Sequence, residues 1–212
     1  FDLKTISEIA KRRGIILIVD NTFATPYFQK PIGLGADVVV YSGTKYLAGH
    51  NDTLAGFLVV NSAELSEKLR FLYKTTGSCL SPFDSWLVLR GLKTLHLRME
   101  RQNLTAKRVA EFLSVHPNVE RVLYPGVGGM ISFYAVSEAL ARTSLERLGL
   151  IYFAESLGGV ETLITYPMTQ THADIPAEER ERKGINGKLL RISVGVEDAE
   201  DIISDLDQAL KG

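Results

Sequence analysis

Apolar residues repeat with a helical period at the start of the chain and then give way to short continuous apolar runs. The segment DLKTISEIAKRRG has apolar positions at helical spacing, with Asp2 as an expected N-cap and Gly14 as a stop. Three apolar runs follow: IILIVD, DVVVY and GFLVV. Because none of them alternates with polar residues, they predict strands buried on both faces of a mostly parallel sheet with flanking helices.

A helical pattern returns at NSAELSEKLRFLYKTT and continues from Ser81-Pro82 to His116, with a bend expected near Gly91. Beyond it, shorter strands mix with helices, in the order VERVLYP, GMISFYAV, SEALARTSLERLG, VETLITYP, LLRISVGV and DAEDIISDLDQAL. This mixture predicts a second, smaller α/β unit. We therefore expect one domain over residues 1–92 and another over residues 93–212.

Composition narrows the class of protein. The 212 residues are 45% apolar and 23% charged, as in an ordinary globular protein, and the net charge of −1 argues against nucleic-acid binding. No apolar run approaches the roughly 18 residues needed to span a bilayer. The single cysteine, Cys79, suits a reducing, cytoplasmic compartment and is expected to be a buried apolar residue. The chain starts at Phe1 without an initiator Met, so we expect it to be a piece of a longer protein.

Polar residues follow the first two apolar runs, where open α/β sheets bind their ligands. They are Asp20, Asn21 and Thr22 after the first run, and Ser42, Thr44 and Lys45 after the second. Alone, Asp20 indicates a turn or a helix cap, and Lys45 indicates a solvated charge. Together with two hydroxyls they match pyridoxal phosphate, which needs a Schiff-base lysine, a carboxylate at its pyridine nitrogen and donors for its phosphate.

Two other interpretations of Lys45 are weaker. Tyr41 and Lys45 have the Tyr-x-x-x-Lys spacing of some dehydrogenases, but that pair must lie on a helix and Tyr41 closes a strand pattern. The segment SGTK has its lysine after the threonine, whereas a P-loop has the lysine before it. A P-loop also needs a glycine five residues before Gly43, and there is none at that position.

Five collinear segments resemble the Cys/Met-metabolism family of pyridoxal-phosphate enzymes. They are VDNTFATPYFQKPIGLGADVVVYSGTKYLAGHNDTLAG, SPFDSWLVLRGLKTLHLRME, ESLGGVETLITYP, QTHADIPAEER and LLRISVGVED. The resemblance covers nearly the whole chain. It implies the C-terminal part of a fold-type I, aspartate-aminotransferase-like enzyme: the second half of the large cofactor-binding domain, then a smaller α/β C-terminal domain.

The resemblance also implies a role for each matching residue. Lys45 would be the Schiff-base lysine and catalytic base, and Asp20 would hold the pyridine nitrogen. The remaining cofactor contacts would come from Thr22 at the ring and from Ser42 and Thr44 at the phosphate. The substrate would be bound by a second set, in which Arg191 and Ser156 receive its α-carboxylate and Thr171 helps to position them. Glu155 would also belong to this set. No metal ligands are expected, since His50, His96, His116 and His172 are scattered and suit capping or packing roles.

The reaction implied is trans-sulfuration of sulfur amino acids or homoserine esters. Glu155 and the segments GHNDTLAG and TYPMTQTHADIP favour γ-replacement of the cystathionine γ-synthase type. Elimination by a cystathionine γ-lyase or β-lyase is the alternative within the family. A non-catalytic fragment or paralogue that acts as a binding or assembly partner is the alternative outside it.

Two departures from the family are expected to matter. Family members carry a first part of the large domain ahead of the position of Phe1, and a longer loop where Gly126 is here followed directly by Val127. Either this loop is deleted, or the sequence omits a disordered segment there. The family forms homotetramers whose active sites are shared between subunits. We therefore expect the intact protein to be a homotetramer that binds small amino-acid substrates, and this chain to be inactive alone.

Overall fold

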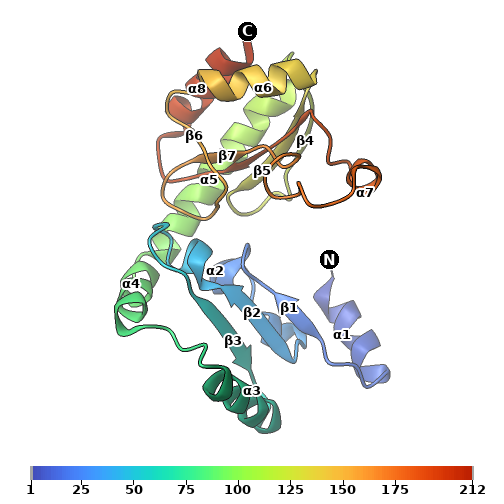
Figure 1. The fold of residues 1–212 in the computed structure, drawn as a ribbon, viewed down its shortest axis with the longest axis vertical. Coiled ribbons are helices and arrows are strands. Elements are labelled where there is room, and N and C mark those ends of the chain that lie inside the picture. The colour runs from blue at the N-terminus through green and yellow to red at the C-terminus, as the bar shows by residue number, and fades with distance from the viewer. Residues whose placement is uncertain (1, 212) are drawn as a thin grey trace. The chain divides into compact units, whose positions relative to one another are not determined.

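The computed structural model describes residues 2–211, and the chain folds as two compact units, Phe1–Leu95 and His96–Gly212 (Figure 1). The sequence placed the domain boundary at residue 92, which is the last residue of helix α4 (Pro82–Leu92). Helix α5 (Leu95–Val115) begins just beyond it. None of the helices within residues 2–211 has the length and apolar character required to cross a bilayer.

The first unit is built on a three-stranded sheet in the order β1-β2-β3, from β1 (Ile18–Asp20), β2 (Val38–Ser42) and β3 (Gly56–Val60) (Figure 1). Helix α1 (Leu3–Arg12) precedes it, and the Asp2 carboxylate accepts hydrogen bonds from the backbone N–H groups of Lys4 and Thr5. The expected N-cap is therefore confirmed. Between β1 and β2 the chain forms short helices α2 (Thr25–Phe28) and η1 (Pro31–Leu34).

The strands differ from the expected parallel set in two respects. β1 and β2 are parallel, but β3 runs antiparallel to β2, with Val40 opposite Leu58. A parallel return needs a long crossover, and only the short helix η2 (Gly43–Leu47) and a loop separate β2 from β3. β1 is also not buried on both faces, because it lies at the edge of the described sheet and Ile18 is 61% exposed.

The expected long helical stretch is divided into α4 and α5, after helix α3 (Ala63–Thr76). The bend lies close to Gly91, where a Cβ atom would stand 2.1 Å from the backbone oxygen of Ala48. Glycine therefore lets α4 approach η2 closely. Cys79 lies in the link between α3 and α4 and is exposed, so the expectation that it is buried was wrong. Position in a surface link, rather than side-chain polarity, decides its exposure.

The second unit holds a five-stranded sheet in the order β4-β5-β8-β7-β6. Its strands are β4 (Val119–Leu123), β5 (Met130–Ala135), β6 (Tyr152–Phe153), β7 (Leu163–Thr165) and β8 (Leu189–Ser193), and its helices after α5 are α6 (Glu138–Arg147), α7 (Ala177–Arg182) and α8 (Ala199–Lys211). The β6–β7 pair is parallel, while the other pairs are antiparallel. The mixed α/β character expected for this part of the chain is confirmed, although β6 and α7 were not foreseen.

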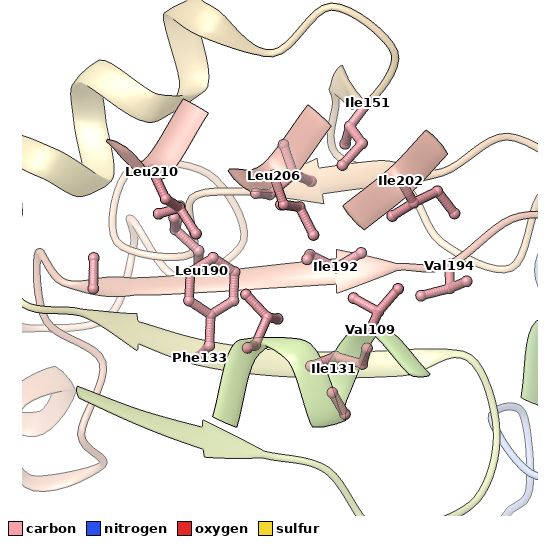
Figure 2. Close-up of a cluster of buried hydrophobic side chains, with 14 of the residues drawn as sticks. Val109, Ile131, Phe133, Ile151, Leu190, Ile192, Val194, Ile202, Leu206 and Leu210 are labelled. Carbon is pink, nitrogen blue, oxygen red and sulfur yellow. The ribbon is translucent and has the colours of Figure 1, made fainter. Parts of the chain in front are cut away.

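One face of this sheet forms the main core (Figure 2). Leu190 and Ile192 of β8 and Phe133 of β5 are fully buried there against Val109 of α5 and Leu206 of α8. Because successive strand residues point to opposite faces, Arg191 and Ser193 lie on the other face of β8. The alternation in LLRIS thus separates the packed side of the sheet from a polar side.

Asp205 of α8 fixes the segment that leads into β6. Its two carboxylate oxygens accept hydrogen bonds of 2.8–2.9 Å from the backbone N–H groups of Gly149, Leu150 and Ile151. Burial acts to raise the pKa of Asp205, but these backbone bonds and one from Gln208 outweigh it, so that the pKa is lowered. The folded state therefore favours the ionised carboxylate.

We expect Asp205→Ala to reduce the free energy of unfolding by about 2–3 kcal/mol at neutral pH, because three backbone donors lose a charged acceptor. Since the folded pKa is depressed, this stabilisation is present above the ordinary aspartate pKa and is lost as the pH falls through the folded value. Urea unfolding at pH 7 and in acid measures both effects. Glu120→Gln, which breaks the exposed pair with Lys188, should cost under about 1 kcal/mol. Equal losses in both variants would contradict the assignment.

Candidate functional site

The parallel pairing of β1 with β2 brings the first group of predicted residues together. Asp20 pairs with Val40 in the register of the two strands, so the strands end at the same edge, about 4.8 Å apart. The Asp20 carboxylate accepts a hydrogen bond from the backbone N–H of Thr22 at 3.0 Å. The Thr22 hydroxyl oxygen accepts one from the backbone N–H of Ser42 at 2.8 Å. Asp20, Thr22 and Ser42 are thereby linked.

Lys45 follows this edge at a break in helix η2. Its backbone angles, φ −87° and ψ −129°, are not helical and interrupt Gly43–Leu47. Gly43 is required just before it, since a Cβ atom there would stand 2.5 Å from the Phe57 ring. The Thr44 hydroxyl accepts from the Ala55 N–H at 3.1 Å and donates to the Ala55 oxygen at 3.3 Å. In this structure Thr44 therefore fastens η2 to the start of β3.

An amide network beneath this edge was not predicted from the sequence. Asn21 is 2% exposed, and its amide nitrogen donates to the backbone oxygens of Thr25 and Gln29 and to the phenol oxygen of Tyr41. Gln29 in turn donates to the Asn21 side-chain oxygen at 2.9 Å. Asn21 stands beside Asp20 in the sequence, but nothing in its spacing distinguishes a structural amide from a ligand. Tyr41 lies within β2 and is buried, so the helical Tyr-x-x-x-Lys geometry is absent.

The second group of predicted residues lies in the second unit. Arg191 stands opposite Ser132 of β5 and Thr165 of β7 on the polar side of the sheet. The Thr171 hydroxyl lies 2.7 Å from Nδ1 of His172. Burial first, and then the positive charges of Arg191 and Lys183, lower the pKa of His172. The structure thus brings Arg191 near the Thr171–His172 pair.

Glu155 and Ser156 follow strand β6 at the same end of the sheet. Ala154 donates its backbone N–H to Ile164 at 3.1 Å and accepts a hydrogen bond from the Thr165 hydroxyl. Because Thr165 is the cross-strand partner of Arg191, the segment after Ala154 starts about two strand spacings, or roughly 10 Å, from Arg191. Glu155 is exposed and Ser156 half-buried.

The other histidines have the expected structural surroundings in two cases. His50 places Nδ1 2.8 Å from the backbone oxygen of Ala48, and His116 is buried against the ring of Phe112. His96 is exposed. Within residues 2–211, no three or more His, Cys, Asp and Glu side chains are grouped in a way that could hold a metal ion.

The family model for Cys/Met metabolism PLP-dependent enzymes matches residues 1–211. The chain belongs to this family. It is 55% identical to a cystathionine gamma-synthase of Haemophilus influenzae over 208 residues, which are 98% of this chain and 56% of that protein. It is 50% identical to a cystathionine gamma-lyase of Bacillus subtilis over 226 residues, covering 99% of this chain and 60% of that protein. The chain therefore spans somewhat more than half the length of these relatives.

Solved structures of this family share the fold. A cystathionine gamma-lyase from Micromonospora echinospora superimposes with a TM-score of 0.97 at 41% identity, over all of this chain and 60% of that one. A cystathionine gamma-lyase from Lactobacillus plantarum complexed with L-serine gives 0.96 at 39% identity, over 99% of this chain and 59% of that one. The expectation of a fold-type I fragment is confirmed.

The polar groups at the end of β1 and β2 fit the cofactor of this family. Among the described residues, the Lys45 amine, the Ser42 hydroxyl and the second oxygen of Asp20 have no hydrogen-bond partner, whereas the hydroxyls of Thr22 and Thr44 bond to the backbone. An amine, a hydroxyl and a carboxylate are the groups that pyridoxal phosphate uses. The polar groups at this edge of the sheet therefore match those needed to bind pyridoxal phosphate.

We expect the imidazole of His172 to lose its proton at a lower pH than a free histidine. Arg191→Met should raise the pKa of His172, because the variant removes a nearby positive charge. A pH titration of the imidazole signals by NMR measures the change. Lys188→Met removes a cation of the same unit that pairs with Glu120, and it should leave the pKa unchanged. An equal pKa in the wild type and Arg191→Met would place Arg191 away from His172.

Proposed function

We propose that this chain is part of a pyridoxal-phosphate enzyme that performs γ-replacement on a homoserine ester, as a cystathionine γ-synthase does. The observation that carries this choice is the length of the alignments. Two relatives whose names include cystathionine gamma-synthase align over 208 and 209 residues. The gamma-lyase and beta-lyase relatives align over 226, more than the 212 residues of this chain, so those lyases carry extra residues.

The connection between β4 and β5 supports the same choice. The sequence left open whether the loop at Gly126-Val127 is deleted or a disordered segment is omitted, and the chain there closes a compact turn. The Tyr124 phenol donates to the backbone oxygen of Gly128 at 3.0 Å, and the Gly128 N–H donates to the side chain of Asn103 at 3.0 Å. These hydrogen bonds hold the short connection in a defined turn. A short connection here is consistent with the two γ-synthase alignments, which need no extra residues.

The residues of the first unit would hold the cofactor and move the proton. When bound, pyridoxal phosphate supplies an electron sink for charge that develops on the substrate's α-carbon. Asp20 would keep the ring nitrogen protonated, and Ser42 would donate to the phosphate. The Lys45 amine would carry the cofactor covalently and, once released, take the proton from the α-carbon.

The residues of the second unit would bind the substrate's α-carboxylate. The planar guanidinium of Arg191 can donate two parallel hydrogen bonds to a carboxylate. Ser156, after β6, would donate a further one, with Glu155 beside it and Thr171 positioning the group. We further propose that the whole protein is a cytoplasmic homotetramer with active sites shared between subunits.

Elimination is the second candidate function. The match to the Micromonospora echinospora gamma-lyase structure and the 50% identity to the Bacillus subtilis gamma-lyase favour it. The same groups would serve both reactions, because each begins with removal of the α-proton.

Product analysis separates the two reactions. The full-length protein is supplied with O-acetylhomoserine or O-succinylhomoserine, each with and without cysteine, and separately with cystathionine alone. We expect cystathionine to accumulate only when an ester and cysteine are both present. Release of 2-oxobutanoate from cystathionine, without synthesis from either ester, would replace γ-synthase by γ-lyase; release of pyruvate would indicate a β-lyase.

Lys45 should be the residue that carries the cofactor. The full-length protein is incubated with pyridoxal phosphate, reduced with borohydride and digested, and the label is located by mass spectrometry. Lys45→Arg should lose the label and reduce turnover by about 10³-fold or more, because it removes both the attachment point and the base. Lys30→Arg, at an exposed lysine of the same unit, should keep both. Absence of label at Lys45 in the wild type would favour a non-catalytic binding partner.

A further inference from the structure

The loop that follows Ser156 is held from two directions by buried side chains. The Ser193 hydroxyl oxygen, on β8, accepts a hydrogen bond from the backbone N–H of Gly158 at 2.8 Å. The amide nitrogen of Gln102, on α5, donates to the backbone oxygen of Gly159 at 2.7 Å. Gln102 is 0% exposed and Ser193 2% exposed. We define these two contacts as the loop clamp.

The clamp lies between the two residues proposed to bind the substrate's carboxylate. Ser193 is two residues after Arg191 on β8, so both side chains leave the same face of the strand. Gly158 is two residues after Ser156, and its φ of +80° suits glycine. The Ser193–Gly158 bond therefore links the strand of Arg191 to the loop of Ser156 over a short path.

The end of the loop farther from Ser156 is hydrogen-bonded to the segment that follows β8. Val196 donates its backbone N–H to Val160 at 2.8 Å, and Gly195 donates to the Thr162 hydroxyl oxygen at 2.9 Å. Gly195 has no room for a side chain, since a Cβ atom would stand 2.3 Å from the Val160 oxygen. Within residues 2–211, the hydrogen bonds to Gly158 and Gly159 are the two of the clamp, and these glycines lie two and three residues after Ser156.

Stability alone does not explain why Gln102 is a glutamine. Its side-chain oxygen is buried and has no hydrogen-bond partner among the described residues. An intramolecular hydrogen bond contributes about 0.5–1.5 kcal/mol net, whereas a buried acceptor without a partner costs about 1–3 kcal/mol. An apolar side chain of the same length would remove this partnerless oxygen but would leave the buried Gly159 oxygen without its donor, so the costs of the two unsatisfied acceptors are similar. Only the amide N–H of Gln102 can hold the backbone oxygen of Gly159 in its position.

We propose that Gln102 and Ser193 are positioning residues that set the distance and orientation of Ser156 relative to Arg191, and thereby the affinity for the substrate's α-carboxylate. The inference rests on the proposed function, because it presupposes that Arg191 and Ser156 bind that carboxylate. Neither clamp residue would touch the substrate.

Binding of two small probes to the full-length holoenzyme tests the clamp. L-Homoserine carries the α-carboxylate but no leaving group, and 3-aminopropan-1-ol is the same molecule without the carboxylate. Both dissociation constants are read from the absorbance of the bound cofactor. We expect Gln102→Met and Ser193→Ala each to weaken L-homoserine binding by about tenfold, while 3-aminopropan-1-ol binding stays within about twofold.

Matched controls separate positioning from general damage. Gln208→Met removes another glutamine-to-backbone bond of 2.7 Å, from Gln208 to the Arg147 oxygen, and should leave both dissociation constants unchanged. Gln102→Met should lower the melting temperature only modestly, because it exchanges the partnerless Gln102 oxygen for a partnerless Gly159 oxygen and loses one hydrogen bond. Gln102→Leu also removes the donor, and should behave like Gln102→Met in L-homoserine binding.

Arg191→Lys distinguishes failure of the clamp from failure of the proposed function. If Arg191→Lys weakens L-homoserine binding but the clamp variants do not, the clamp inference is wrong and the proposed carboxylate site stands. If Arg191→Lys has no effect on L-homoserine binding, both the proposed carboxylate site and the clamp inference are wrong. Equal weakening of both probes in the clamp variants would also overturn the inference, because it would indicate loss of structure rather than of carboxylate binding.

Discussion

The parallel pairing of β1 with β2 is the constraint on which the candidate cofactor site depends. It ends both strands at one edge, so that a carboxylate and a lysine twenty-five positions apart in sequence follow neighbouring strands. The Thr22–Ser42 hydrogen bond then ties the two strand ends together. The Asn21 network joins Thr25, Gln29 and Tyr41, and within residues 2–211 the amine of Lys45 and one oxygen of Asp20 have no hydrogen-bond partner.

The sheet of the second unit has a different requirement: one face packs against helices, and the other face presents polar groups. The alternation in LLRIS does both. Leu190 and Ile192 enter the core between α5 and α8, and this packing fixes the direction of Arg191 and Ser193 on the opposite face. The proposed carboxylate-binding residue thus owes its orientation to its apolar neighbours in the strand.

Much of this organisation follows from the sequence, because periodicity and caps act locally. The N-cap at Asp2, the helix start at Ser81-Pro82 and the strand end at Asp20 are all visible as patterns, and the expected end of the second strand at Tyr41 is one residue short of its end at Ser42. The direction of β3 is not, since GFLVV has the same composition as a parallel strand and only the short connection decides its direction. The exposure of Cys79 and the bonding of the Thr44 hydroxyl likewise depend on tertiary neighbours.

Gln102 illustrates why some functional candidates emerge only from a structure. It lies within an expected helical stretch with nothing in the sequence to mark it, and a buried glutamine is usually a fully bonded structural residue. What distinguishes it is the combination of one bond to Gly159 and one buried oxygen without a partner among the described residues. A buried side chain that leaves one of its polar atoms without a partner is unfavourable for stability. Its presence beside the loop that follows Ser156 therefore points to geometry as the property that the residue provides.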